Sequence, residues 1–338
     1  MDICEELLHA ESGALERREK EPAFDTQGLS EKLLAINDVN ALASVAPIAM
    51  RLCRQFHAQG RSFEVLPIAQ AVHERAVSIG SKELAHPAAN ACGLLSADTA
   101  DFAAAIDYHG QALLITDSQG DLVASSRIWN NVGGALSIAG QYDNAMKCFQ
   151  RSLEKIESLP SPQFSRYGAL TNLAQCEFYL HDTHSGLYFA ELALEESRSA
   201  SGSEQVDTFS QILLHRNTVR LLVDAGRVAE AKVHAQHAVS LARADGGLRA
   251  SIAAATALAV LDIAMGENDV ALTRLECSLA DSRSVWPAFR DTLACTIRAE
   301  EAIGSPEKAL LRLRELSELL HDRGRRSAIR PGDRQLAA

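Results

Sequence analysis

Aromatic residues and prolines are scarce in this chain of 338 residues. Only 5% of the residues are aromatic and Pro occurs 9 times, whereas 47% of the residues are hydrophobic, chiefly Ala and Leu. A sheet protein needs stretches rich in Val, Ile, Thr and aromatics between frequent turns, so this composition favours packed helices. It also excludes a disordered chain, because the apolar content can bury enough surface to offset the entropy of ordering.

An excess of positive charge and a long apolar run are also missing. The chain has 33 Lys and Arg against 44 Asp and Glu, for a net charge of -11, which would repel nucleic acids and anionic membranes. Its longest strongly apolar run, Ile252 to Leu261, is far shorter than the roughly 20 residues of a membrane span. The N-terminus carries acids where a secretory signal has positive charge. We therefore expect a cytoplasmic protein that binds neither nucleic acid nor membranes.

Paired cysteines are absent as well. The seven cysteines are scattered and never form a C-x-x-C motif, so neither a disulfide framework nor a zinc site is indicated. We expect all seven to be small apolar side chains buried between helices. They are Cys4, Cys53, Cys92, Cys148, Cys176, Cys277 and Cys295.

What the chain does contain is an internal repeat. The clearest unit begins at Ser126 and has Trp129 and Gly133 before a Gly140 turn, followed by Ala145 and Phe149 at helical spacing. This pattern resembles the tetratricopeptide repeat, which has a large residue at position 4, Gly at 8, a turn near 15, and Ala and an aromatic at 20 and 24. The resemblance implies a pair of antiparallel helices in each unit.

The same template fits seven times, at intervals of 38 to 45 residues. The predicted turns are at Gly60, Ala100, Gly140, His181, Gly226, Gly266 and Gly304. Position 20 is then filled by Val65, Ala105, Ala145, Gly186, Ala231, Ala271 and Ala309. These side chains are nearly all small, as expected where the second helix of a unit presses against the first.

The sequence thus predicts an all-α protein, a right-handed superhelical solenoid of about seven tetratricopeptide-like helix pairs with N-terminal capping helices. The units start near residues 46, 86, 126, 167, 212, 252 and 290, within a solenoid spanning 46–322. Residues 1–45 are predicted to form the cap, with helices over 2–20 and 28–43, because the end of a stack must be covered. A dimer contact is the alternative for this segment, and residues 1–27 are an alternative groove occupant. The basic segment 323–338 is predicted to be a disordered tail or a linker stub.

Recognisable catalytic chemistry is missing. No phosphate-binding glycine loop and no nucleophile motif occurs in the sequence. His181 and His184 are spaced three apart but lie on a predicted turn, and His321 with Asp322 lacks the other ligands of a metal-dependent phosphohydrolase. We expect no enzymatic activity, no metal and no cofactor.

Function should instead lie on the concave face, which the first helix of each unit lines with positions 2, 5, 6, 9, 12 and 13. Asn131, Asn172 and Asn217 occupy position 6 in three successive units, and Asn90 and Asn130 occupy position 5. An amide can both donate to and accept from a peptide backbone. In tetratricopeptide peptide receptors, including kinesin light chains and quorum-sensing receptors of Gram-positive bacteria, Asn at this position is used similarly. The alternative role is hydrogen bonding between neighbouring helices.

Basic, amide and aromatic residues surround these asparagines, and the basic ones would attract a ligand that carries a carboxylate. They are Arg54, Arg127, Gln175, Phe178, Tyr179, Arg216 and Arg220. For each arginine the alternative role is a solvated surface charge. Trp129, at position 4, is expected in the core.

The leading functional hypothesis is a non-enzymatic module that binds a protein or peptide segment in its concave groove. The repeats are also similar to the sensory modules of bacterial signalling proteins, which implies a regulatory role, with a homodimer or a covalently linked output domain as a further partner. One alternative is a small-molecule sensor that binds a sugar or nucleotide against Arg216, Arg220, Phe178 and Tyr179, and controls a cyclic-di-GMP enzyme, a kinase or a transcription activator. Another is a purely structural scaffold.

Overall fold

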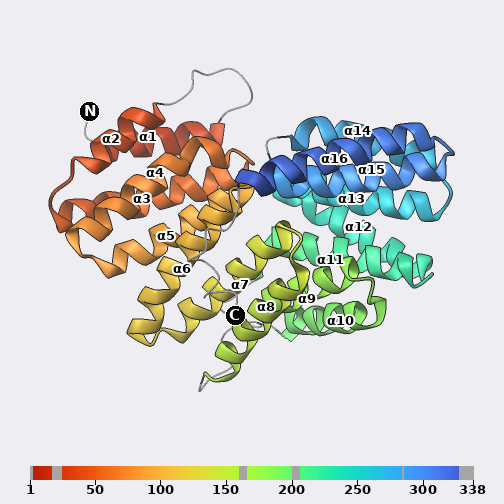
Figure 1. The fold of residues 1–338 in the computed structure, drawn as a ribbon, viewed down its shortest axis with the longest axis horizontal. Coiled ribbons are helices and arrows are strands. Elements are labelled where there is room, and N and C mark those ends of the chain that lie inside the picture. The colour runs from red at the N-terminus through yellow and green to blue at the C-terminus, as the bar shows by residue number, and fades with distance from the viewer. Residues whose placement is uncertain (1–2, 17–24, 160–165, 200–205, 284, 327–338) are drawn as a thin grey trace. The chain divides into compact units, whose positions relative to one another are not determined.

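The computed structural model describes residues 3–16, 25–159, 166–199, 206–283 and 285–326, and all secondary structure in these ranges is helical (Figure 1). The helices are α1 (Ile3–Glu16), α2 (Thr26–Leu34), α3 (Val39–Ala58), α4 (Ser62–Ile79), α5 (Lys82–Asp98), α6 (Phe102–Gln119), α7 (Leu122–Ile138), α8 (Tyr142–Glu157), α9 (Tyr167–Tyr179), α10 (Thr183–Ser199), α11 (Thr208–Asp224), α12 (Val228–Asp245), α13 (Leu248–Ala264), α14 (Asn268–Ser282), α15 (Trp286–Ala302) and α16 (Pro306–Arg326). From α3 onward they form seven consecutive pairs, which confirms the all-α helical-repeat fold.

The turn inside each pair is formed at the predicted residue. Gly60, Gly140, Gly226, Gly266 and Gly304 all have positive φ values, between 73° and 81°. The two predicted turns without glycine, at Ala100 and His181, adopt the same left-handed conformation with φ of 62° and 63°. A residue with a Cβ is disfavoured there. The repeat therefore imposes the turn even where the local sequence does not favour it.

The small residues at position 20 lie where the two helices of a pair touch. Val65, Ala105, Ala145, Ala231 and Ala271 are 0% exposed. At Gly186, the equivalent residue of α10, an added Cβ would lie 3.4 Å from the Glu177 Cβ atom of the partner helix α9 and 2.5 Å from the Leu221 Cδ2 atom of α11 in the next pair. A larger side chain at this position would push the helices apart.

Aspartates begin several helices. The side chains of Asp25, Asp38, Asp101 and Asp207 each accept a hydrogen bond from the backbone N–H three residues later, satisfying donors that a helix start leaves free. The cap at Asp38 shows that the predicted single helix over 28–43 is wrong. Because Asp38 adopts an extended conformation, α2 ends at Leu34 and a new helix, α3, begins at Val39.

Helix bounds differ from the predicted unit starts in a regular way. The predicted boundary at residue 45 falls inside α3. Five later first helices begin four residues before the predicted unit start, and α9 begins at its predicted start, residue 167. At the C-terminal end, α16 continues to Arg326, so residues 323–326 are helical rather than disordered. The predictions for residues 1–2, 17–24 and 327–338 lie outside the described residues.

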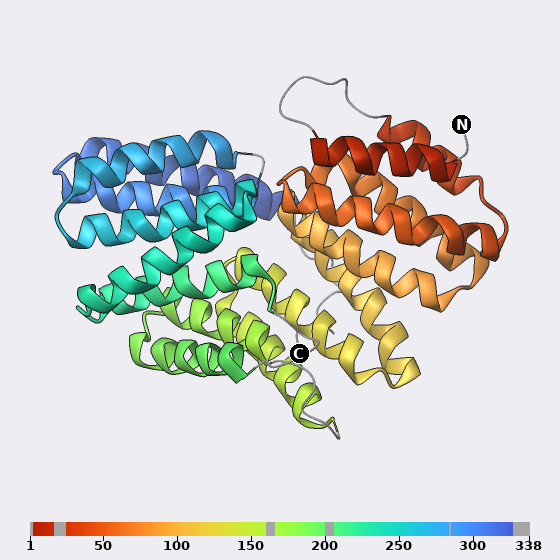
Figure 2. The ribbon, with the colours of Figure 1, turned by 180° about the vertical axis from the view of Figure 1, so that it is seen from behind.

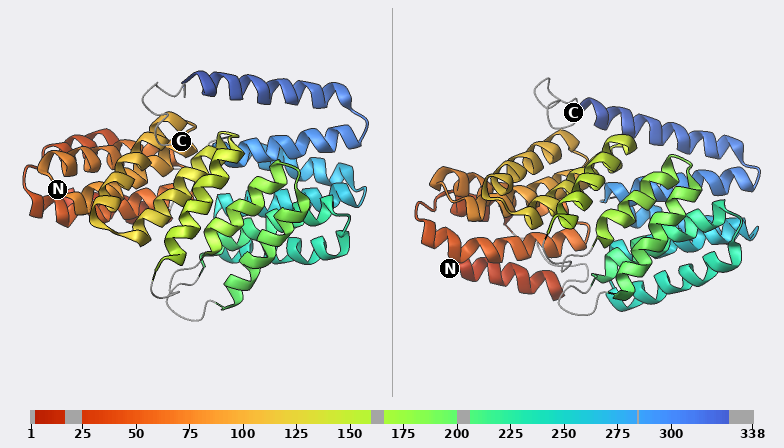
Figure 3. Two further views of the ribbon diagram at one scale, coloured as in Figure 1. Left: turned by 60° about the horizontal axis from the view of Figure 1, so that its bottom comes forward. Right: turned by 90° about the horizontal axis from the view of Figure 1, so that it is seen from below.

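The described part of the chain divides into two compact units. Unit 1 contains the described residues of 1–135, and unit 2 contains 136–326. Figure 2 shows α1 through α5 of unit 1 lying side by side. The core of this unit joins these helices, and Leu7, Leu33, Leu42 and Leu52 in it are fully buried. In unit 2, α16 packs along α15 at the end of the stack (Figure 3).

Most of the predicted core residues are buried. Trp129 is 8% exposed, and five of the seven cysteines are buried. Cys4 is half-buried and Cys277 is exposed, so the expectation of burial was wrong for Cys277. None of the described helices is long and apolar enough to cross a membrane.

Candidate functional site

The inner face of unit 2 contains a cavity of about 250 Å³. We call the surface formed by positions 2, 5, 6, 9, 12 and 13 of the first helices the inner face. The residues around the cavity come from the ends of α11, α13 and α15, and all eight occupy positions 6, 9, 12 or 13 of their units. They are Val223, Asp224, Val260, Ile263, Ala264, Cys295, Arg298 and Glu301.

The cavity combines an apolar wall with a charged rim. Aliphatic side chains from α11 and α13 form the wall, and charged side chains from α11 and α15 form the rim. At the rim, the Arg298 Nη2 and Asp224 Oδ1 atoms are 3.7 Å apart, and the Arg298 side chain is 50% exposed. Glu301 is exposed beside them. An apolar hollow with a few charged groups at its mouth is typical of a site that binds an organic side chain or a small molecule.

Next to this cavity, three arginines surround one aspartate in the interior of unit 2. We call Arg216, Arg220, Arg290 and Asp291 the arginine cluster. The Asp291 carboxylate is 3.2 Å from the Arg216 Nη1 atom, 3.5 Å from the Arg220 Nη1 atom and 3.0 Å from the Arg290 Nη2 atom. The four residues are 6%, 2%, 8% and 4% exposed, respectively. Charges this deeply buried must be paired or otherwise stabilised.

The electrostatics follow from this packing. Burial would raise the pKa of the Asp291 carboxyl, but the three guanidiniums, with Arg220 first, hold that pKa well below its usual range. Burial lowers the pKa of Arg216, and the like charge of Arg220 adds to the effect. Burial raises the pKa of Tyr179, whose hydroxyl donates to the Asp291 Oδ1 atom at 2.6 Å. Tyr179 is therefore a neutral donor at physiological pH.

Aromatic rings cover part of the arginine cluster. The rings of Tyr142 and Tyr179 are stacked, with centroids 4.8 Å apart and planes 7° apart. The Arg290 guanidinium lies 5.3 Å from the Tyr179 ring centroid, and that of Arg220 lies 5.4 Å from the Phe178 centroid. These are cation–π distances, and such contacts stabilise a desolvated guanidinium.

Arg290 also binds the end of α7 from far along the chain. Its Nη1 atom donates to the carbonyl oxygens of Ser137 and Ile138 at 3.1 and 2.8 Å. The last carbonyls of a helix lack intrahelical partners and attract positive charge. This contact joins α15, in the seventh helix pair, to α7, in the third.

The residues predicted for ligand binding are divided between the two units. In unit 1, Arg54 and Arg127 are exposed, while Asn130 and Asn131 are half-buried. The Asn131 Nδ2 atom donates to the Asn90 Oδ1 atom at 2.9 Å, which is the helix-to-helix role that the sequence left open. Ligand binding by these residues stays a prediction.

In unit 2 the predicted residues differ in exposure. Asn172 and Gln175 are half-buried, whereas Asn217 is 1% exposed. The Asn217 Oδ1 atom accepts from Arg216 at 3.1 Å, and its Nδ2 atom donates to the Thr171 carbonyl at 3.5 Å. The structure thus brings Asn217 together with Arg216, Arg220, Phe178 and Tyr179. The asparagine and the two arginines are buried, and the two aromatic residues are half-buried.

Sequence reasoning missed two parts of this site. Arg290 and Asp291 are adjacent charged residues in a largely buried segment of α15. Two neighbouring charges within a mostly apolar helical segment are a signal that could have indicated this site from the sequence. The cavity wall could not be predicted, because its aliphatic residues have the same sequence pattern as ordinary core residues.

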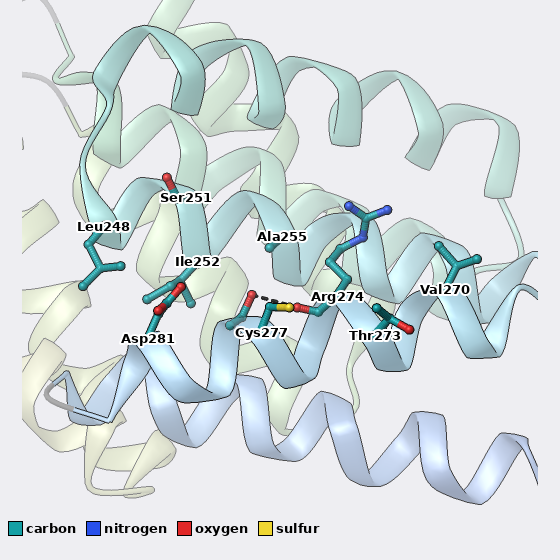
Figure 4. A pocket seen from close by; sticks show the side chains of 10 residues that line it. Leu248, Ser251, Ile252, Ala255, Val270, Thr273, Arg274, Cys277 and Asp281 are labelled. Atoms are coloured by element: carbon teal, nitrogen blue, oxygen red, sulfur yellow. Dashed lines mark hydrogen bonds between the residues drawn. The ribbon is translucent and has the colours of Figure 1, made fainter.

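A second hollow lies away from the inner face. It measures about 560 Å³, and Figure 4 shows its side chains extending from α13 and α14. Leu248, Ile252 and Val270 contribute apolar surface, and the exposed Cys277 lies near its centre. Arg274 there is paired with Asp262 at 3.2 Å.

Several histidines of the described ranges lie near one another or near turns. His184 is exposed near the turn at His181, and no group of three or more His, Cys, Asp or Glu side chains in the described part of the chain could hold a metal ion. A histidine cluster does occur between α11 and α12, where the Nδ1 atoms of His215 and His234 are 2.9 Å apart and His237 stacks on His215.

Comparison with known proteins supports the fold. No family model and no curated protein matches the sequence. The structure is similar to that of a Rap protein complexed with competence and sporulation factor, with 15% identity, a TM-score of 0.58, and 96% of this chain and 91% of that chain covered. It is also similar to the apo form of RapI, with 10% identity, a TM-score of 0.59, and 84% of this chain and 98% of that chain covered.

A third similar structure is BtubC from P. vanneervenii, with 15% identity, a TM-score of 0.51, and 73% of this chain and 93% of that chain covered. Sequence identities this low establish likeness of fold only. The chain therefore has the fold of tetratricopeptide-like helical-repeat proteins.

Proposed function

We propose that this chain is a non-enzymatic regulatory module that binds a protein or peptide segment on its inner face. The observation that carries the proposal is the cavity of about 250 Å³, whose eight lining residues all occupy inner-face positions of three consecutive units. Its apolar wall suits one side chain of a bound segment, and the charged rim suits the polar groups around it. A Rap protein of similar fold was crystallised with competence and sporulation factor, which agrees with a bound ligand on such a scaffold.

Two further parts of the hypothesis depend on this binding. A role in bacterial signalling and a linked output domain or second copy stay predictions. If such a partner is present, a ligand that binds one packing of the helix pairs more tightly would increase the population of that packing. The surface that the helix pairs present to the partner would then change.

The proposal can be tested with a random peptide library displayed on phage and the full chain as bait. Ala264 is exposed and lines the cavity, so Ala264→Trp would fill it with little strain on the core. We expect the selected peptides to bind at least tenfold more weakly to this variant. Val270→Trp is the matched control, because Val270 is 48% exposed and lines the other hollow. Equal affinity for all three proteins, or no selected peptide at all, would contradict the proposal.

A further inference from the structure

The arginine cluster carries more positive than negative charge. Each of its three arginines pairs with Asp291, and among the described residues none of the three has another acidic partner. Their other contacts are with neutral groups: the Tyr179 hydroxyl, the Asn217 amide, the Cys295 sulfur and the Ser137 and Ile138 carbonyls. Two buried positive charges therefore lack a counter-charge, and such charges are costly unless an anion compensates them.

Arg220 has the least satisfactory contacts of the three. Although it is 2% exposed, its Nη1 atom is 3.5 Å from both Asp291 Oδ2 and the Tyr179 hydroxyl, and its Nη2 atom is 3.9 Å from Cys295 Sγ. Charge-assisted hydrogen bonds are normally about 2.7 to 2.9 Å long. Arg220 could therefore make shorter hydrogen bonds to an additional acceptor.

The cavity supplies a place from which such an acceptor can come. Cys295, which contacts Arg220, is also one of the residues that line the cavity. The carboxylates of Asp224 and Glu301 lie at the rim and would repel a free anion there, but they can accept hydrogen bonds from hydroxyl or amino groups. None of the three arginines lines the cavity itself, so Cys295 is the side chain that connects the arginine cluster to it, and carboxylate acceptors lie at the rim.

We propose that Arg216, Arg220 and Arg290 bind the phosphate group of a small phosphate monoester, whose hydroxyl or amino groups contact the rim of the cavity. A phosphate monoester carries about 1.5 to 2 negative charges at pH 7 and three strong acceptor oxygens, which match the excess charge and the three guanidiniums. This site goes beyond the proposed binding of a protein or peptide segment and does not depend on it.

Inorganic phosphate is the first probe, measured by the melting temperature of the full chain at constant ionic strength. We expect the melting temperature to rise with phosphate and to saturate, whereas NaCl of the same ionic strength has no such effect. Glucose 6-phosphate should bind at least threefold more tightly than inorganic phosphate, because its hydroxyls reach the rim. Glucose alone should not bind.

Three variants distinguish a phosphate site from a purely structural ion network. Arg220→Gln should weaken phosphate binding at least tenfold, and Arg220→Lys should weaken it less. Asp291→Asn should strengthen phosphate binding severalfold, because it removes the carboxylate that repels the ligand, even though it lowers the melting temperature without phosphate. Arg274→Gln is the control. It removes an arginine of α14 that pairs with Asp262 of α13, outside the arginine cluster, and it should respond to phosphate as the wild type does.

Restored helicity of Asp291→Asn in phosphate, if this variant is unfolded in NaCl, would support the proposal. A phosphate response no larger than that of NaCl, or the same response in the wild type and Arg220→Gln, would overturn it and leave the arginine cluster as a structural network. Binding of phosphate without any preference for glucose 6-phosphate would mean an adventitious ion only.

Discussion

The two units use polar side chains in opposite ways. In unit 1, polar contacts join neighbouring repeats: Asn131 to Asn90, which are 41 residues apart, and His73 to Gln111, which are 38 apart. In unit 2, Tyr179 contacts Asp291, 112 residues away, and Arg290 reaches Ser137, 153 residues away. Unit 1 behaves like a simple stack in which each repeat stabilises the next. Unit 2 adds contacts that skip repeats, so its inner helices should unfold together.

The largest expected effect comes from removing the carboxylate of the arginine cluster. Asp291→Asn leaves three buried guanidiniums without an ionic partner, and we expect unit 2 to lose about 3 to 5 kcal/mol of unfolding free energy. Hydrogen exchange should increase in α9, α11 and α15 together. Glu230→Gln, which breaks the exposed pair with Arg227, is the control and should change nothing measurable. Faster exchange confined to α15 would show that the network does not couple these helices.

A glycine in unit 1 tests packing that involves only adjacent helices. An added Cβ at Gly93 would lie 2.5 to 2.7 Å from three atoms of the His109 ring, so Gly93→Ala should cost about 1 to 3 kcal/mol. Gly134→Ala is the matched control, because nothing lies within 4 Å of its added Cβ, and it should be neutral or slightly stabilising. Urea unfolding measures both, and equal losses would contradict the packing argument.

The same histidine makes the stability of unit 1 depend on pH. His109 is 0% exposed, neither ring nitrogen has a hydrogen-bond partner in the described part of the chain, and burial lowers its pKa to about 3. Below pH 6.5 the unfolded chain binds a proton that the folded chain does not, so stability falls as the pH falls. We expect a loss of about 2 kcal/mol between pH 7 and pH 5 from this residue.

His109→Phe should remove that part of the pH dependence, which urea unfolding at several pH values will show. Phe occupies the equivalent position 24 in the third unit, at Phe149, so the variant should fold. In unit 2, burial lowers the pKa of His215 to about 4, and the neighbouring His234 and His237 add to this, so the same direction is expected there. An unchanged pH profile for His109→Phe would contradict this explanation.

The smallest expected effect concerns the asparagines of unit 1. Asn131→Ala removes a half-buried hydrogen bond and should cost about 1 kcal/mol, with little further loss when Asn90→Ala is added. A double-mutant cycle measures this coupling. If the losses of unfolding free energy in Asn131→Ala and Asn90→Ala are fully additive, the hydrogen bond between the two residues does not contribute to stability. That result would contradict the helix-to-helix role and favour the ligand-binding role.

Periodic features of this molecule could be predicted from the sequence, and long-range ones could not. The turns at Ala100 and His181 could be predicted because the repeat places a turn at position 15 of each unit, whichever residue stands there. The break at Asp38 was missed because an aspartate cap inside an otherwise helical pattern is a weak local signal. The sequence grouped Tyr179, Arg216 and Arg220 as ligand contacts, and the structure places all three against Asp291. Asp291 lies 71 to 112 residues further along the chain, and no spacing rule connects it to them.

The most direct test of the inner face of unit 2 as a ligand-binding surface is hydrogen exchange of the full chain with and without a library-selected peptide. The structure predicts slower exchange in the C-terminal halves of α11, α13 and α15, which line the cavity. The outer helices α12 and α14 should not change. Protection confined to α12 and α14, or to unit 1, would contradict the assignment.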